Sequence, residues 1–231
     1  AGIAVGAAFY VYNQILNQSR GFIMDSAYWG PEYGDEEIKN ILDKNNLKYK
    51  YFNDDNLIKT AAKFLADGMV IGWFQGRTEW GPRALGNRSI LANPCISEMK
   101  DILNLKIKKR ESFRPFAPSI LEERVGDYFE DNYPVPFMEK VYFIKPEKRK
   151  EIPAVVHIDG TGRLQSVSLK TNQRYWKLIN EFGNLTGVPI LINTSFNENE
   201  PIVNHPQEAI NCFLRTKMDI IVIGNYLINR E

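Results

Sequence analysis

Glycines and arginines alternate in one short segment of the chain, GRTEWGPRALGNRSIL, which we call the glycine–arginine segment (residues 76–91). Glycine lets a backbone come close to a ligand and adopt positive φ angles, and a guanidinium offers a planar set of N–H donors that matches phosphate or carboxylate oxygens. The residues concerned are Gly76, Gly81, Gly86, Arg77, Arg83 and Arg88. A surface loop with solvated arginines is the simpler alternative. The density of arginine between the glycines favours an anion site.

A second group of positive charges follows in KIKKRESFRPFAP, the basic segment (residues 106–118). Between Arg77 and Arg114 nine Lys and Arg residues stand against four Asp and Glu, a net charge of +5, whereas the whole chain carries +1. Positive charge is therefore concentrated in one region. The overall balance gives no reason to expect a general nucleic-acid-binding protein.

Two further clusters combine polar side chains with strand ends. HIDGTGRLQ, at 157–165, places His157, Asp159 and Arg163 around two glycines. LINTSFNENEPIV, at 191–203, follows an apolar strand with a series of amides and hydroxyls: Asn193, Thr194, Ser195 and Asn197. Such groups can hold a phosphate or a nucleobase edge, although turns that simply end the strand are an alternative.

Helix and strand patterns alternate along the rest of the chain, which predicts an α/β or α+β domain with a mixed sheet. We expect helices at 35–47, 55–67, 97–107 (with Ser97 as its N-cap), 172–185 and 206–216. We expect strands at 69–75, 139–144, 153–158, 164–168, 188–193, 219–223 and 226–228. The strand at 69–75 leads directly into the glycine–arginine segment, so the anion site should lie at a strand end.

Residues 1–18 have small residues first and then a helical spacing of large apolar ones, as in the last helix of a preceding domain. An ordinary N-terminal helix that docks on its own domain is the alternative. We therefore divide the chain into residues 1–30, a remnant of that domain with a linker, and 31–231, the main domain. Cys95 and Cys212 stand alone and no apolar stretch approaches the roughly 20 residues that cross a bilayer, so we expect a cytoplasmic protein without membrane contact.

The four polar motifs, in this order and spacing, resemble the C-terminal domain of nodulation- and antibiotic-type O-carbamoyltransferases, the NodU/CmcH family. The resemblance extends from about residue 23 to residue 228. It implies a YrdC-like fold, a mixed twisted sheet with flanking helices. It also implies a reaction in which this domain uses ATP and carbamoyl phosphate to form carbamoyl adenylate. An N-terminal domain, actin-like and absent here, then transfers the carbamoyl group to a hydroxyl acceptor.

The motifs that match the family imply roles for individual residues of this chain. The resemblance implies catalytic roles, at the carbamoyl and phosphate oxygens and at the triphosphate, for Arg83, Lys108 and Arg114. It implies binding of the triphosphate and nucleotide by Arg110, Arg163, Asn193, Ser195 and Asn197. Lys109 stands where the family usually has histidine. The chemistry of adenylation agrees with these roles, because fixed cations must hold two anions in line during the reaction.

The same resemblance assigns ATP and Mg²⁺ to this domain and Fe²⁺ to the missing N-terminal domain, and it leaves a homodimer open. Consistent with this, we predict no metal cluster, because the chain has only His157 and His205 as histidines. An RNA-binding or tRNA-modifying YrdC-like module is the competing interpretation. It is less favoured because the basic residues accompany glycines at strand ends and no row of stacking aromatics. A third interpretation, an inert interaction domain, predicts no ligand.

Overall fold

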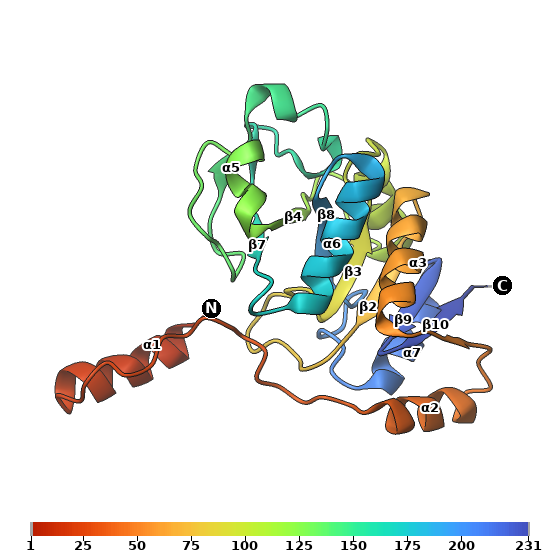
Figure 1. Cartoon of the computed structure of the whole chain (residues 1–231), viewed down its shortest axis with the longest axis horizontal. Helices are drawn as coiled ribbons and strands as arrows, with labels where there is room; N and C mark the ends of the chain where they lie inside the picture. Colours follow the sequence, from red (N-terminus) through yellow and green to blue (C-terminus); the bar gives the residue numbers. More distant parts are fainter. Residues whose placement is uncertain (1, 231) are drawn as a thin grey trace.

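The computed structural model describes residues 2–230. One mixed sheet of eight strands runs through the molecule in the order β1-β10-β9-β2-β3-β8-β4-β7 (Figure 1). Its strands are β1 (Lys50–Tyr51), β2 (Ile71–Phe74), β3 (Arg88–Ala92), β4 (Ala117–Leu121), β7 (Gln165–Val167), β8 (Ile190–Ser195), β9 (Ile220–Ile223) and β10 (Tyr226–Asn229). A small second sheet pairs β5 (Tyr142–Phe143) with β6 (Thr161–Gly162). The pairs β2–β9 and β4–β7 are parallel, and the other pairs are antiparallel, so the expected mixed sheet is confirmed.

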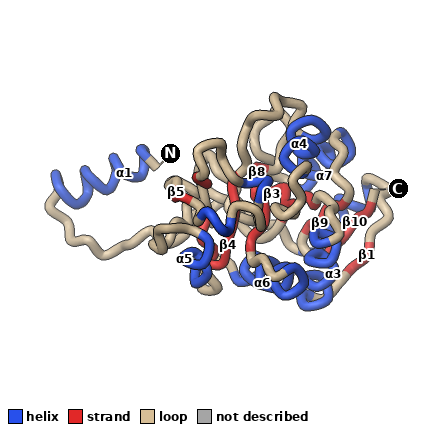
Figure 2. Tube along the Cα trace, turned by 90° about the horizontal axis from the view of Figure 1, so that it is seen from above, coloured by secondary structure: helices blue, strands red, loops and turns tan. Residues whose placement is uncertain are grey.

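Helices cover both faces of the large sheet, which makes a three-layer molecule (Figure 2). On one face α3 (Asp54–Ala66) and α6 (Gln173–Thr186) lie side by side. On the other face lie α2 (Asp35–Lys44), α7 (Pro206–Arg215) and α4 (Met99–Ile102), which continues into the π-helical turn η2 (Leu103–Ile107). Short helical segments connect the remaining elements: η3 (Glu122–Arg124), α5 (Val125–Tyr128), η4 (Pro146–Lys148) and η5 (Pro153–Val155).

Local sequence signals explain the two helices of the first face. Helix α3 begins after Asn53, whose side chain accepts a hydrogen bond from the backbone N–H of Asn56, and α6 begins in the same way after Asn172. Helix α6 ends at Gly187, which has a φ of 80°. Both helices bury one apolar face against the sheet, where Trp73 of β2 is fully buried. Helical periodicity therefore predicted these elements to within a few residues.

Two expectations need correction, and two strands are additional to the expected ones. Residues 153–158 form no strand, because Pro153 opens the 3₁₀ turn η5 and the backbone N–H of Ala154 donates to the carbonyl of Pro94 outside the sheet. Ser97 is not an N-cap, since α4 starts later, after Glu98, without a side-chain capping bond. Strands β3 and β4 were not expected at all. Strand β3 begins in the glycine–arginine segment and β4 begins in the basic segment, and neither segment has the apolar run typical of a buried strand at that point.

The first helix, α1 (Ile3–Tyr10), extends with η1 (Val11–Ile15) away from the body of the molecule (Figure 1). Neither element buries a residue. A contact between the rings of Phe9 and Phe22, 5.9 Å apart, lies within this extension. The division of the chain at residue 30 stays a prediction. Within residues 2–230 no helix has the length and apolar character needed to cross a membrane.

Candidate anion-binding site

A buried carboxylate shapes the glycine–arginine segment. One oxygen of Glu79, Oε1, accepts hydrogen bonds from three backbone N–H groups further along the segment, those of Leu85, Asn87 and Arg88, at 2.7, 2.8 and 3.2 Å. The carboxylate therefore folds the backbone around itself.

The three glycines of the segment all have positive φ angles, as expected: 42° at Gly76, 125° at Gly81 and 105° at Gly86. At Gly86 the space is restricted as well, because an added Cβ would lie 2.1 Å from Cδ1 of Tyr175. Only glycine fits there, and Tyr175 is itself fully buried. Glu79 and Tyr175 thus hold the segment in one conformation.

Three guanidinium groups from different parts of the chain line one small cavity of about 120 Å³, the arginine cavity. Arg83 comes from the glycine–arginine segment, Arg110 from the basic segment, and Arg163 from the turn between β6 and β7. The other lining residues are Pro82, Ala84, Pro115, Phe116, Ala117, Met138, Asn193, Thr194 and Ser195. None of these lining residues is acidic, so every charged group in the lining is a cation.

The arginines of this cavity keep donors free. Arg83 is exposed and has no hydrogen bond to another residue within the described part of the chain. Arg163 is half-buried; its Nη2 contacts only the sulfur of Met138 at 3.8 Å, and its Nε is buried without a partner. Burial and then the nearby Arg83 lower the pKa of Arg163, and burial and then Arg114 lower that of Arg110. An anion between these cations would relieve their mutual repulsion.

The end of β8 supplies the polar wall of the cavity. Asn193 is buried, and its Nδ2 donates to the carbonyl oxygen of Ala84, to Oγ of Ser119 and to Oε1 of Gln165, at 3.2, 3.1 and 2.9 Å. Its Oδ1 has no partner. Since β8 pairs with β3 on one side and β4 on the other, the sheet brings the glycine–arginine and basic segments to this strand end. Ser195 follows as the last residue of the strand.

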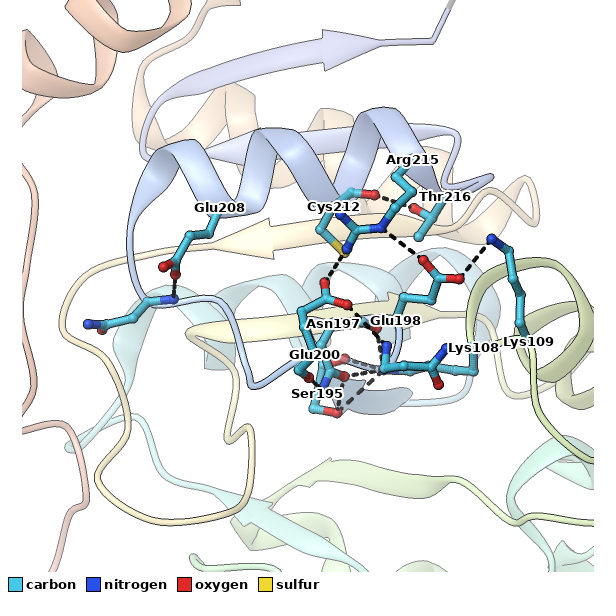
Figure 3. Close-up of polar contacts among 12 residues, drawn as sticks. Lys108, Lys109, Ser195, Asn197, Glu198, Glu200, Glu208, Cys212, Arg215 and Thr216 are labelled. Atoms are coloured by element: carbon cyan, nitrogen blue, oxygen red, sulfur yellow. Dashed lines mark hydrogen bonds and ion pairs between the residues drawn. The ribbon is translucent and has the colours of Figure 1, made fainter.

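Lys108 points to the loop after β8 and does not line the arginine cavity (Figure 3). Its ammonium donates to the carbonyl oxygens of Ser195 and Asn197 at 2.5 and 2.8 Å and to Oδ1 of Asn197 at 2.8 Å. Oδ1 of Asn197 also accepts from the hydroxyl of Ser195 at 2.7 Å. Burial lowers the pKa of Lys108 to about 7, although these oxygens favour the charged form. In this arrangement Lys108 and Asn197 hold Ser195 in place.

Arg114 lies outside the cavity lining as well. Its side chain is 51% exposed and pairs with Glu111 at 2.9 Å. Lys109, beside Lys108, pairs with Glu198 at 2.7 Å, and Arg215 of α7 pairs with the same carboxylate at 2.9 Å (Figure 3). The structure therefore brings together five of the eight sequence-predicted site residues at the cavity: Arg83, Arg110, Arg163, Asn193 and Ser195.

Arg88 has a structural role that the sequence did not reveal. It is fully buried as the first residue of β3, and its guanidinium stacks 3.6 Å from the ring centroid of Phe74. Its two terminal nitrogens donate to backbone carbonyls, including that of Gln75 at 2.5 Å and that of Gly76 at 3.1 Å. Arg88 is therefore not available to a ligand.

A larger cavity of about 370 Å³, the apolar cavity, adjoins the first and shares Arg83, Met138 and Arg163 with it. Its walls are mainly apolar, with Met24, Trp80, Leu85 and Phe137 among them. Sequence reasoning missed these residues, because nothing in the local pattern places Met24 or Phe137 beside residue 83. Trp80 is the exception among the four, because it lies inside the glycine–arginine segment.

Metal ligation and the histidines add little to the site. Among residues 2–230 no group of three or more His, Cys, Asp or Glu side chains is arranged to hold a metal ion. His157 begins a turn, where its Nδ1 is 3.0 Å from Oγ1 of Thr161. The assignment of iron to another domain stays a prediction.

Comparison with solved structures identifies the fold. Full-length HypF in a phosphate- and nucleotide-bound form superposes with a TM-score of 0.52 at 20% identity, over 80% of this chain and 23% of that one. Sua5 of P. abyssi, complexed with L-threonine, gives the same TM-score at 13% identity, over 76% of this chain and 48% of that one. At such identities the similarity concerns the fold alone. It confirms the expected YrdC-like domain.

Sequence relatives identify the family. Nodulation protein NolNO of Sinorhizobium fredii is 46% identical over 100% of this chain and 35% of its own length. Nodulation protein NolO of Bradyrhizobium diazoefficiens is 45% identical over 100% of this chain and 43% of its own length. The chain thus spans less than half the length of these relatives. The family described as Carbamoyltransferase C-terminus matches residues 62–230, and the chain belongs to that family.

Proposed function

We propose that the arginine cavity binds the anions of carbamoyl phosphate and ATP and that the domain forms carbamoyl adenylate. The observation that carries this proposal is the convergence of Arg83, Arg110 and Arg163 on one cavity whose lining contains no carboxylate. Three arginines that line one cavity raise the free energy of the empty site, and bound phosphate or carbamate oxygens lower it. Membership of the carbamoyltransferase family supports the choice of carbamoyl phosphate as one of the anions.

The reaction has two chemical steps. Water cleaves carbamoyl phosphate to carbamate, inorganic phosphate and a proton. A carbamate oxygen then attacks the α-phosphorus of ATP, the bond from that phosphorus to the bridging oxygen breaks, and pyrophosphate leaves with the bonding electrons. Both reactants of the second step are anions, so neutralisation and alignment by Arg83, Arg110 and Arg163 would provide most of the catalysis.

The apolar cavity is the place that we propose for the nucleoside of ATP. It is the larger of the two, it has the aromatic walls Trp80 and Phe137, and it shares Arg83 and Arg163 with the arginine cavity. A nucleotide that spans the boundary would put its base against apolar surface and its phosphates against the shared arginines.

The remaining predicted site residues receive supporting roles in this proposal. Lys108 and Asn197 fix the hydroxyl and backbone of Ser195, which lines the arginine cavity and would contact the substrate there. Arg114, exposed beside the cavity, would reach the ligand only by leaving Glu111. Asn193 contributes its amide oxygen, which has no partner in the described structure.

Mg²⁺ is proposed only as the counter-ion that ATP brings with it. The cavity lining has hydroxyl and amide oxygens but no carboxylate, which is the usual protein ligand for this ion, and no step is assigned to it. Fe²⁺ is proposed for a different domain of the longer protein, on the family resemblance alone.

The relatives are more than twice as long as this chain, so we propose that carbamoyl transfer to a hydroxyl acceptor uses an N-terminal domain of that kind. The exposed apolar side chains of α1 and η1, including Ile3, Tyr10 and Ile15, suit contact with such a domain. A cytoplasmic location and a homodimer also remain proposals.

The test is an assay of pyrophosphate release with ATP, Mg²⁺ and carbamoyl phosphate, with matched reactions that omit each substrate. We expect release that depends on both substrates, and no carbamoylation of added sugar or aminoglycoside hydroxyls by this chain. Tight RNA binding, with a steep dependence on salt concentration and no stabilisation by millimolar ATP, would favour the tRNA-modification alternative instead.

A further inference from the structure

One buried side chain, Asn104, makes all of its hydrogen bonds to the basic segment. It lies in the π-helical turn η2 and has no exposed surface. Its Nδ2 donates to the carbonyl oxygens of Ser112 and Arg114 at 3.2 and 2.9 Å, and its Oδ1 accepts from Nε of Arg110 at 2.7 Å. An amide buried among apolar neighbours costs free energy unless it is hydrogen-bonded, so a purely packing role would favour an apolar residue here.

The partners of Asn104 leave its amide only one orientation. The two carbonyl oxygens accept only, and Nε of Arg110 donates only, so the oxygen must face the arginine and the nitrogen must face the carbonyls. The backbone carbonyl of Asn104 accepts a further hydrogen bond, from the N–H of Arg110 at 3.0 Å. Asn104 therefore holds both the backbone and the side chain of Arg110.

Asn104 also determines which donors of Arg110 face the ligand. With Nε bound to Asn104 and the guanidinium 4.9 Å from the ring centroid of Phe116, the terminal nitrogens remain without a hydrogen-bond partner in the described chain. Arg110 lines the arginine cavity, while Asn104 does not. Before Arg110 the chain turns sharply at Lys109, whose φ of 44° is in the left-handed region. Contacts that hold this turn keep a flexible arginine in one place.

We propose that Asn104 is a positioning residue: it aims the guanidinium of Arg110 at the anion in the arginine cavity without touching the ligand. This role rests on the proposed function, because it needs an anion at that site. It predicts that substitution of Asn104 weakens anion binding only through Arg110.

A double-mutant cycle tests that dependence. Dissociation constants for ATP and for inorganic pyrophosphate are measured by calorimetry on the wild type, Asn104→Leu, Arg110→Ala and the double variant. Leucine has the same number of side-chain non-hydrogen atoms in the same branched arrangement and makes no hydrogen bonds. We expect Asn104→Leu to raise the dissociation constant about tenfold alone and less than twofold when Arg110 is already alanine. In the matched cycle with Arg163→Ala in place of Arg110→Ala, the effects of Asn104→Leu and Arg163→Ala on the dissociation constant should multiply.

Thermal unfolding shows whether each variant folds. If Asn104→Leu does not fold, Asn104→Ala replaces it, because alanine removes all three side-chain hydrogen bonds without adding bulk or charge; the same pattern is expected. Multiplicative effects in the Arg110 cycle, or an unchanged dissociation constant, would overturn the role of Asn104 alone. A wild type that binds neither ATP nor pyrophosphate would overturn the proposed function and this role with it.

Discussion

The buried ammonium of Lys108 makes the stability of the protein depend on pH in a way that one substitution should remove. Burial lowers the pKa of Lys108 from its ordinary value of about 10.5 to about 7 in the folded protein. Between these values the unfolded chain binds a proton that the folded protein does not, so the free energy of unfolding rises as the pH increases. The loss of stability that results from burying a charged Lys108 is fully present below pH 7 and disappears above about pH 10.5.

The expected size follows from the two pKa values. Integrated from pH 6.5 to pH 9, this single group contributes an increase of about 2.5 kcal/mol in the free energy of unfolding. Lys108→Met keeps the length of the side chain but cannot titrate. The difference in stability between the wild type and Lys108→Met should therefore change by about 2.5 kcal/mol over this range, in favour of the wild type at high pH.

Urea unfolding of both proteins at several pH values measures this difference, and other groups, such as Cys212 beside the lysine, largely cancel in it. Lys150, which is exposed, provides the control as Lys150→Met and should show no such trend. A stability difference that stays constant from pH 6.5 to pH 9 would refute the reasoning. It would mean that the oxygens of Ser195 and Asn197 keep Lys108 charged at an ordinary pKa.

Further predictions concern the glycine–arginine segment and the cations. Glu79→Ala should lower the free energy of unfolding, measured with urea, by about 3 kcal/mol or more, because it leaves three buried backbone N–H groups without an acceptor. Glu79→Gln should lower it less. Equal urea midpoints for the wild type and both variants would contradict this. Gly86→Ala should lower the melting temperature strongly or prevent folding, since its Cβ would collide with Tyr175, and a melting temperature within a degree or two of the wild type would show that the ring moves aside. Arg83→Ala should reduce the rate of pyrophosphate release about a hundredfold, and Arg114→Ala should reduce it less because Arg114 is exposed and ion-paired; the reverse order would contradict the placement of the site.

Much of the fold could be predicted because its signals are local. The long helices follow from apolar periodicity and from caps such as Asn53 and Gly187, which act within a few residues of the chain. Strand β3 was missed because Arg88 and its neighbours carry the composition of a loop. The buried cation is tolerated in a strand only because Phe74 and backbone carbonyls from elsewhere surround it.

For the site, the sequence alone identified the segments that form the candidate cavity: glycines that need positive φ angles stand among arginines, and the four motifs occur in the family's order. Only the tertiary structure decided which cations face the cavity. Arg83, Arg110 and Arg163 do, whereas Lys108 turns to the loop after β8 and Arg114 to solvent. The physical reason is that the direction of a long side chain depends on partners that strand pairing brings together. The pairing of β3 and β4 with β8 joins residues far apart in the sequence, and no local pattern encodes that meeting.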